Sequence, residues 1–305
     1  GGRRIIKKKI GEVAQAAISA AKESAIAVFM LGVRRVRADD CLVMSKSLSE
    51  TETDGREGIG ARGPSPPPEP GLYVVATPIG NLRDISLRAL DILAGVSRVY
   101  AEDTRVARKL LDAHGLKPWL GAYHDHSNES ARREILEALG AGESVALISD
   151  AGTPLISDPG FKLARAAIEA GFKVVPIPGA CAALAGLVAS GMATDRFMFL
   201  GFLPAKQVGR RGALEVVADI DVTLVVYESG PRLADSLADM ADILGNRPAA
   251  VARELTKLFE ETRRDTLAAL AAHYSEAGPP KGEIVVVIGP PLQTEVSDDA
   301  LDGFL

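Results

Sequence analysis

The sequence predicts a two-domain α/β protein whose N-terminal domain contains a parallel β-sheet. Short apolar runs alternate with amphipathic helical segments from residue 71 onward, and this alternation favours parallel strands joined by right-handed crossovers. Loops rich in glycine, alanine and proline follow several of the apolar runs. The chain has 305 residues, which is enough for two domains.

Residues 144–183 contain the clearest of these βαβ units. Residues 145–148 form a short apolar run, which is typical of a strand buried on both faces. Asp158 is expected to cap the next helix, with Pro159 in its first turn. Residues 174–177 are expected to form a second buried strand. The unit therefore predicts two strands of one parallel sheet.

Two loops of tiny residues follow these strands, at residues 150–154 and 178–183. In open α/β sheets, ligands bind in the crevice beyond the carboxyl ends of the strands. Small residues in such loops let backbone amides and carbonyls approach a ligand closely. The sequence therefore predicts a ligand-binding site at these loops.

The remaining folded part follows the same pattern and divides near residues 187–194. Further strands are expected at residues 72–76, 99–101, 197–201, 223–227, 249–252, 260–266 and 284–288. Helices are expected around residues 85–93, before Gly115, at residues 128–139 and 211–219, and from about Pro231 to Leu244. We therefore expect an N-terminal α/β domain at residues 71–190, a C-terminal α/β domain at residues 191–293 and a loose tail at residues 294–305.

Residues 1–70 differ in character from the rest of the chain. A basic cluster is followed by a mostly apolar stretch that contains Lys22 and Glu23, and these charges weigh against a transmembrane helix or a signal peptide. Residues 45–70 are rich in Ser, Glu, Gly and Pro, which predicts a disordered linker. Residues 1–43 are expected to derive from a misplaced gene start.

The composition indicates an ordinary soluble protein. The chain is 47% hydrophobic and 25% charged, and its formal net charge is −5. This charge argues against nonspecific coating of nucleic acid, so an RNA partner would need a local basic patch. The two cysteines are too few for a disulfide framework, which favours a reducing, cytoplasmic location.

No phosphate-binding motif follows the predicted strands. The loop at residues 77–81 lacks the three glycines of a dinucleotide fingerprint, and by itself it is typical of an ordinary turn. The expected ligand therefore contains no bound diphosphate. His124 and His126 lack the further partners of a metal site, so no metal is expected. Cys181 is interpreted as an inert cysteine rather than a nucleophile.

Charged residues follow two of the predicted strands. Asp103 either caps the next helix, with Arg105 on the surface, or lies with Glu102 and Arg105 in a cleft where they contact the substrate. Arg253 and Lys257 either lie on a solvated rim or steer a phosphate backbone into the cleft. The residue pattern leaves these alternatives open.

Several motifs resemble the tetrapyrrole methylase superfamily and, within it, the methyltransferases of small-subunit ribosomal RNA. They are LYVVATPIGNLRDISLRAL, AEDTR, SDAGTPLISDPG, PGACAA, TDRFMFLGFLP, YESGPR and RELTK, and they occur in order across residues 71–290. The resemblance implies two α/β domains with S-adenosylmethionine bound in the cleft between them. It also implies methylation of the ribose 2′-oxygen of a cytidine in the decoding region, by a cytoplasmic homodimer without a membrane partner.

The resemblance further implies which residues contact the cofactor. They are Pro78, Gly80, Asp150, Ala151, Gly152, Thr153, Ile156, Cys181, Ala182 and Glu228. Cys181 stands where these enzymes more often have serine, a residue of similar size. S-adenosylmethionine contains no phosphate, which agrees with the lack of a glycine-rich phosphate loop.

The expected substrate contacts are Asn81, Arg105, Arg253 and Lys257. A ribose hydroxyl is a poor nucleophile at neutral pH, so close positioning and a general base would both accelerate methyl transfer. We hypothesise that Asp103 or Glu102 orients or deprotonates this hydroxyl. Two other functions stay open, a methylase of a corrin or porphyrin precursor and a noncatalytic module that binds S-adenosylmethionine or RNA, although the AEDTR and RELTK motifs favour the RNA enzyme.

Overall fold

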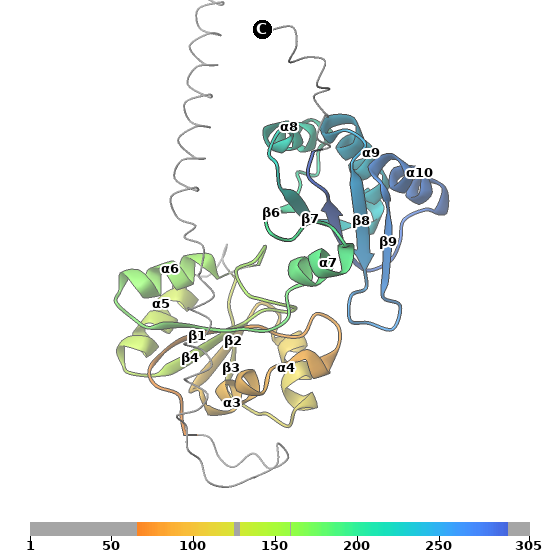
Figure 1. Ribbon diagram of the computed structural model, residues 1–305. Helices are drawn as coiled ribbons and strands as arrows, with labels where there is room; N and C mark the ends of the chain where they lie inside the picture. The colour runs from red at the N-terminus through yellow and green to blue at the C-terminus, as the bar shows by residue number, and fades with distance from the viewer. Residues whose placement is uncertain (1–65, 125–128, 159, 292–305) are drawn as a thin grey trace, which may run out of the picture. The chain divides into compact units, whose positions relative to one another are not determined.

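The computed structural model describes residues 66–124, 129–158 and 160–291, which form two five-stranded sheets with flanking helices (Figure 1). These residues pack as one unit. The expectations for the N-terminal extension, for Asp125 and His126, for Pro159 and for the tail lie outside the described residues. Within the described ranges, no helix combines the length and the hydropathy that crossing a membrane requires.

The N-terminal sheet consists of five parallel strands in the order β3-β2-β4-β1-β5. The strands are β1 (Gly71–Val75), β2 (Arg98–Ala101), β3 (Leu120–Ala122), β4 (Ser144–Ile148) and β5 (Val174–Ile177). β1 and β4 are buried along their whole length. The predicted parallel sheet is therefore confirmed.

Helices cover both faces of this sheet (Figure 1). α3 and α4 pack on one face, where Leu90 and Leu111 join the core. α5 and α6 pack on the other face, through Ile135 and Leu163. The bounds are η1 (Leu82–Asp84), α3 (Leu87–Gly95), α4 (Thr104–Ala113), α5 (Glu129–Gly140) and α6 (Phe161–Glu169).

β5 differs from the predicted buried strand. It lies at the edge of the sheet, with Val174 and Val175 half-buried and Pro176 exposed. An edge position tolerates proline, which cannot donate a ladder hydrogen bond. β1 lies between β4 and β5, so the two small-residue loops do not follow neighbouring strands.

Asp158 does not cap α6, contrary to the prediction. The helix begins at Phe161, and its N-cap is Gly160, which has a φ of 119° and no capping side chain. A Cβ on Gly160 would lie 2.6 Å from Leu147 Cδ2. Glycine is required here by both the left-handed φ and the close approach to β4.

The C-terminal sheet is mixed, with the strand order β6-β7-β10-β8-β9. β6 and β7 are parallel, and the other neighbours are antiparallel. The strands are β6 (Phe197–Phe202), β7 (Thr223–Ser229), β8 (Pro248–Arg253), β9 (Glu261–Thr266) and β10 (Glu283–Ile288). The last strand of the chain thus occupies the centre of the sheet, which places it next to β7.

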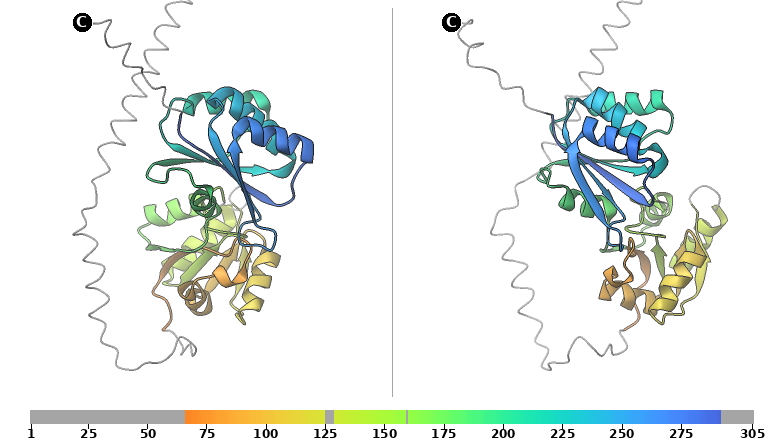
Figure 2. Two further views of the ribbon diagram at one scale, coloured as in Figure 1. Left: turned by 45° about the vertical axis from the view of Figure 1, so that its right-hand side comes forward. Right: turned by 90° about the vertical axis from the view of Figure 1, so that its right-hand side faces the viewer.

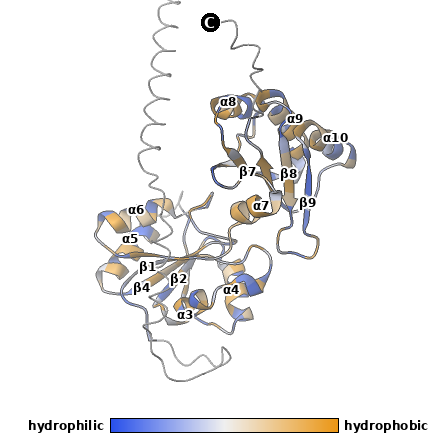
Figure 3. Ribbon diagram, viewed as in Figure 1, coloured by the Kyte–Doolittle hydropathy of each residue, from blue (hydrophilic) through white to orange (hydrophobic). Residues whose placement is uncertain are grey.

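Helices also cover both faces of the C-terminal sheet. α8 (Gln207–Val217), η2 (Gly230–Arg232), α9 (Leu233–Leu244) and α10 (Leu267–Ala277) follow its strands. Leu214, Leu237 and Leu270 of α8, α9 and α10 form one core on the same face (Figures 1 and 2). The central strands are apolar, whereas β9 at the edge is hydrophilic (Figure 3).

The opposite face of this sheet packs against α7 (Ala182–Ser190). A Cβ on Gly186 would lie 2.7 Å from Val285 Cγ1, so glycine lets α7 approach β10 closely. Arg264 of β9 donates to the Ser190 carbonyl at 3.1 Å and holds the end of the helix. α7 therefore packs with the C-terminal sheet, although the expected boundary at residue 190 groups it with the N-terminal domain. The boundaries themselves stay a prediction.

Candidate functional site

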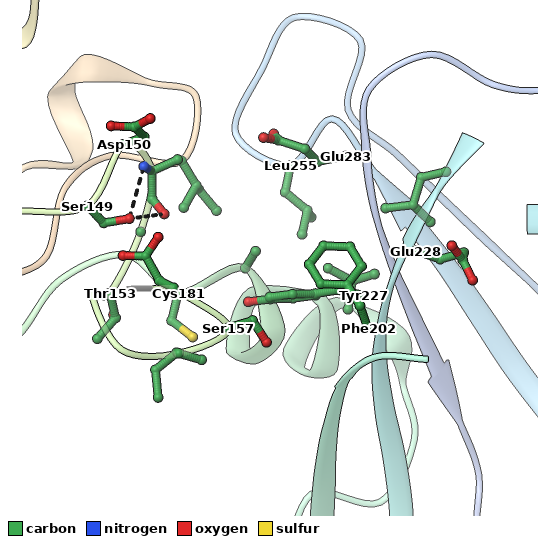
Figure 4. A pocket seen from close by; sticks show the side chains of 18 of the residues that line it. Ser149, Asp150, Thr153, Ser157, Cys181, Phe202, Tyr227, Glu228, Leu255 and Glu283 are labelled. Atoms are coloured by element: carbon green, nitrogen blue, oxygen red, sulfur yellow. Dashed lines mark hydrogen bonds between the residues drawn. The ribbon is translucent and has the colours of Figure 1, made fainter. Parts of the chain in front are cut away.

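A cavity of about 410 Å³ lies between the loops that follow β1 and β4 and the strands β7 and β10 (Figure 4). We call this cavity the central pocket. Ile79 and residues 149–153 form one wall, and Tyr227 and residues 282–285 form the other. Cys181, directly before α7, lies between the walls. Both sheets therefore contribute to one pocket.

The loop after β4 is held by the loop after β1. Thr77 and Gly152 exchange two backbone hydrogen bonds, of 2.9 and 3.1 Å. Gly152 has a φ of 87°, and a Cβ on it would lie 3.2 Å from Ile79 Cγ2. The Thr153 hydroxyl donates to the Ala180 carbonyl at 3.0 Å, which ties this loop to the segment before α7. This wall of the pocket is thus a loop whose backbone is held from two sides.

Strained backbone is concentrated around this pocket. Leu155 and Ser157 have φ values of 70° and 55°, and across the pocket Glu254 and Thr256, which flank the lining residue Leu255, have φ values of 50° and 66°. A left-handed conformation costs a side-chain-bearing residue roughly 1–2 kcal/mol. Such strain persists at functional sites, where the surroundings impose a defined geometry.

Two aromatic residues form the wall contributed by the C-terminal sheet. The rings of Phe202 and Tyr227 meet edge to face with centroids 5.5 Å apart. The Tyr227 hydroxyl accepts a hydrogen bond of 3.1 Å from the Ala183 amide in the first turn of α7. Burial raises the pKa of Tyr227 to about 12, so its hydroxyl stays protonated at neutral pH. The wall is therefore apolar, uncharged and anchored to α7.

The carboxylate of Glu228 lies behind this wall rather than in the pocket. Glu228 is 2% exposed and follows Tyr227 on β7, so the two side chains point to opposite faces of the sheet (Figure 4). Its carboxylate accepts hydrogen bonds from the Ser229 amide at 2.8 Å and the Ser236 hydroxyl at 2.5 Å, and it pairs with Arg232 at 3.2 Å. Only the backbone of Glu228 is available to a ligand.

Eight of the ten predicted cofactor residues line the central pocket. They are Asp150, Ala151, Gly152, Thr153, Ile156, Cys181, Ala182 and Glu228. Pro78 and Gly80 are not among the lining residues, whereas Ile79 between them is. A Cβ on Gly80 would lie 2.5 Å from Lys257 Cγ, so its small size serves the contact with the loop after β8. The cofactor roles of all ten stay predictions.

The sequence interpretation missed the aromatic wall and residues 282–285. β7 and β10 were expected as strands, but not their antiparallel pairing, which sets Tyr227 opposite Val285. Gly282 has a φ of 95°, and a Cβ on it would lie 1.9 Å from Glu254 Oε1. The Lys-Gly-Glu sequence at residues 281–283 was the local signal for this part of the wall. Its place in the pocket follows only from the long-range pairing of β10 with β7.

A second cavity of about 410 Å³ lies at the carboxyl ends of β2 and β3, and we call it the polar pocket. Its lining includes Glu102, Asp103, Arg105, His124 and Asp150. Asp150 lines both cavities, and its carboxylate accepts a hydrogen bond of 3.0 Å from the Asp103 amide. The structure thus brings the predicted catalytic carboxylates beside the predicted cofactor loop.

Asp103 caps α4 and pairs with Arg105 at the same time. Its carboxylate accepts a hydrogen bond of 2.8 Å from the Arg105 amide and forms an ion pair of 2.6 Å with the Arg105 guanidinium. This guanidinium holds the pKa of Asp103 well below its usual range. Capping and pocket lining are therefore compatible, and Asp103 is an ionised carboxylate of low basicity.

The predicted substrate residues on the C-terminal sheet are engaged in ion pairs. Lys257 Nζ contacts Glu254 and Glu283, each at 3.0 Å. Arg253 Nε contacts Glu261 at 2.7 Å. Neither cation is free to meet a phosphate without breaking these pairs, so the structure favours a positioning role for both.

Asn81 connects the two sheets through backbone and side-chain contacts. Its side chain accepts a hydrogen bond of 3.1 Å from the Arg83 amide and caps η1. Its own amide donates to the Thr256 hydroxyl at 3.2 Å. The predicted substrate contact of Asn81 stays a prediction, and the structure gives this residue a structural role in the contact between the loop after β1 and the loop after β8.

The chemistry of the central pocket fits a positively charged ligand without phosphates. Besides Glu228, whose carboxylate lies behind the wall, the residues that line it include three acidic ones, Asp150, Asp158 and Glu283, and neither lysine nor arginine. Acidic residues disfavour a phosphate and favour a cation such as a sulfonium or ammonium group. The aromatic wall suits a flat ring, and the small side chains of Ala151 and Gly152 leave room for a ligand close to the loop.

The described residues contain no group of three or more His, Cys, Asp or Glu side chains placed to hold a metal ion. His124 lies in the polar pocket. Its neighbour in the sequence pattern, His126, lies outside the described residues.

The sequence matches the family model of tetrapyrrole (corrin/porphyrin) methylases over residues 71–271. The chain belongs to this family of methyltransferases. The predicted fold and the predicted methyl donor, S-adenosylmethionine, are therefore confirmed at the level of the family.

Relatives at about half identity carry one common name. Ribosomal RNA small subunit methyltransferase I of Mesorhizobium japonicum is 55% identical over 228 residues, which cover 74% of this chain and 78% of the relative. The proteins of the same name from Erythrobacter litoralis and Haemophilus influenzae are 54% and 48% identical, over 76% and 75% of this chain and 82% and 81% of theirs. The resemblance stated from the motifs is confirmed.

Solved structures with the same fold are more distant in sequence. A diphthine synthase aligns with a TM-score of 0.56 at 16% identity, covering 72% of this chain and 89% of that one. A uroporphyrin-III C-methyltransferase from Thermus thermophilus, complexed with S-adenosyl homocysteine, aligns with a TM-score of 0.53 at 19% identity, covering 72% and 97%. At these identities the likeness shows the fold alone.

Proposed function

We propose that this protein transfers the methyl group of S-adenosylmethionine to the ribose 2′-oxygen of a cytidine in the decoding region of small-subunit ribosomal RNA. The names of the relatives support ribosomal RNA as the substrate. One structural observation supports a two-substrate reaction: the central pocket and the polar pocket share Asp150. A donor in the first and a nucleotide in the second would meet at this residue.

The residues around Asp150 suggest how the reaction is assisted. The donor, when bound, supplies a methyl carbon attached to a positively charged sulfur. The acidic lining of the central pocket favours that charge, and the fixed backbone of residues 149–153 orients the bound molecule. The aromatic wall of Phe202 and Tyr227 excludes water from one side.

In the polar pocket, Asp103 is suited to orient the ribose and Glu102 to receive the proton. The Arg105 guanidinium keeps Asp103 ionised, so its carboxylate accepts a hydrogen bond from the 2′-hydroxyl but is a weak base. Glu102 forms no ion pair or side-chain hydrogen bond within the part of the chain that the structure describes. The ribose oxygen gains the methyl group, the carbon–sulfur bond breaks and the proton passes to Glu102 or water.

Two further parts of the proposal concern the assembly and location of the protein. We infer that it acts as a cytoplasmic homodimer, as the motifs imply. Sedimentation of the full chain tests the dimer directly, because a monomer at micromolar concentration would contradict it. The catalytic proposal does not depend on this outcome, since both pockets are formed within one chain.

The decisive experiment supplies purified small ribosomal subunits from cells that lack the gene, together with donor labelled in its methyl group. The proposal expects about one label per subunit, located by nuclease digestion and mass spectrometry on a ribose of a decoding-region cytidine. Label on a base, or at another site of the RNA, would refute the 2′-oxygen assignment. Donor binding without label transfer, or transfer only to a corrin or porphyrin precursor, would support the alternative functions.

A further inference from the structure

α4 is an amphipathic helix with a cationic outer face. Ala107, Leu110 and Leu111 are buried against the N-terminal sheet. Arg105, Arg108 and Lys109 are exposed, and their spacing of three and four residues places them on neighbouring positions of one face. Figure 3 accordingly shows both hydrophilic (blue) and hydrophobic (orange) residues on α4. We call Arg105, Arg108 and Lys109 the α4 stripe.

Arg108 and Lys109 carry exposed charges without a partner among the described residues. Within the described residues, neither one forms an ion pair or a side-chain hydrogen bond. By contrast, Arg98, Arg210 and Arg253 all contact carboxylates at 3.1 Å or less. The two exposed charges on α4 therefore do not serve the internal structure.

The stripe begins at the polar pocket and leads away from it. Arg105 lines that pocket, and Arg108 and Lys109 follow roughly 4.5–6 Å further along the helix axis. From these observations we propose that the outer face of α4 binds the phosphate backbone of the RNA next to the methylated nucleotide. This inference rests on the proposed function and assigns Arg108 and Lys109 as RNA contacts that are not part of the reacting site.

A matched pair of charge reversals tests the proposal in the full-length protein. The test variant is Arg108→Glu with Lys109→Glu. The control variant is Arg133→Glu with Lys162→Glu, which changes the same two residue types at exposed positions of α5 and α6, on the opposite face of the sheet. Donor affinity is measured by calorimetry, and small-subunit binding and methylation are measured across a range of salt concentrations.

The proposal expects unchanged donor affinity in both variants and weaker RNA binding only in the test variant. Loss of two phosphate contacts would reduce the slope of log affinity against log salt by about 1.4–1.8 and weaken binding roughly tenfold or more at 0.1 M salt. KM would rise while kcat changed little. Equal behaviour of the two variants beside an active wild type would overturn the proposal, and so would a changed oligomeric state in the test variant alone. An inactive wild type would instead refute the proposed function.

Discussion

The two sheets of this protein use their charged residues in different ways. The N-terminal domain presents charged side chains at the carboxyl ends of its strands, where Asp103 and Asp150 line cavities. It also presents them on the outside of α4. The helices on the C-terminal sheet include a buried ion pair, Arg210 of α8 with Asp239 of α9 at 2.6 Å, and the carboxylate of Glu228 is buried on β7. The difference suggests a division in which the N-terminal sheet contributes reacting groups and the C-terminal sheet contributes a rigid wall.

This division explains why charged residues such as Arg210, Glu228 and Asp239 lie close to the core of the C-terminal sheet. Glu228 lies directly behind the aromatic wall, and its carboxylate holds the start of the following helical segment through Ser229 and Arg232. A wall that must keep Tyr227 in place gains rigidity from such a network.

The largest expected effect is the loss of stability on replacing Asp239 by alanine. Arg210 is 4% exposed, and without its partner it would remain a buried, uncompensated charge, which costs roughly 3–5 kcal/mol. Denaturant unfolding of the full chain measures this loss. The control is Asp242→Ala, which removes the exposed partner of Arg211 and is expected to cost at most about 1 kcal/mol. Equal losses in the two variants would show that the buried pair is not structural.

The same pair predicts a pH dependence. Burial raises the pKa of Asp239, but hydrogen bonds from Gln207, Arg210 and Arg211 outweigh it, and the net pKa lies below its usual value. A depressed pKa in the folded state stabilises the protein above the unfolded-state pKa of about 3.9, and this stability is lost as the pH falls through the folded-state pKa. The difference in stability between wild type and Asp239→Asn should therefore shrink at acidic pH, and a constant difference would contradict the assignment.

Next in size is the effect of Gly152→Val on donor binding. The left-handed φ of 87° and the contact with Ile79 would displace the pocket loop, and strain of about 1–2 kcal/mol alone corresponds to roughly tenfold in affinity. Calorimetry with S-adenosylmethionine measures the change. Gly142→Val is the control, because Gly142 has a similar φ of 81° but a Cβ added there would have no neighbour within 4 Å. If both variants bound the donor equally, the loop would not form the donor site.

Asp103→Asn tests the reacting face and should lower kcat about tenfold or more, because the ionised acceptor for the ribose hydroxyl is lost. Asparagine still caps α4, so donor affinity and stability should change little. Arg105 keeps the pKa of Asp103 low. The wild-type rate should therefore show no titration of this carboxylate between about pH 5 and pH 8, a range above the reference pKa of aspartate. Unchanged methylation by the variant would remove Asp103 from the reaction.

The smallest expected effect is that of Tyr227→Phe. The Ala183 amide would lose its acceptor at the start of α7, which costs about 1 kcal/mol and corresponds to roughly fivefold in donor affinity. Tyr73→Phe serves as the control, because it removes a hydrogen bond from Tyr73 to the Glu69 carbonyl near the beginning of β1. A larger effect of the control on donor affinity would contradict the assignment of Tyr227 to the pocket wall.

Local sequence patterns predicted most strands but not the elements built from weak local signals. β3 has only three residues, one of them Gly121, and offers no alternation to read. α7 and α10 are rich in alanine, so their apolar faces are not distinct from loops or from buried strands in the sequence. The predictions succeeded where burial on both faces produces a continuous apolar run, as in β1 and β4.

The site was predictable on one side only. The small residues around Gly152 indicated a loop that contacts a ligand, and this required no knowledge of sheet order. Tyr227 and Gly282 belong to the opposite wall because β10 pairs with β7, more than fifty residues away along the chain. No local pattern specifies such a pairing. The burial of the Glu228 carboxylate could not be predicted for the same reason, because it depends on which face of β7 packs against α7.

The most direct test of the account is a crystal structure of the full chain with S-adenosyl homocysteine. We predict that the ligand lies in the central pocket, in contact with the backbone of residues 150–153 and with the aromatic wall of Phe202 and Tyr227. The sulfur should point toward Asp150, where the polar pocket begins. A ligand bound elsewhere, or in the central pocket with its sulfur directed away from Asp150, would contradict the claim that the two cavities form one reaction site.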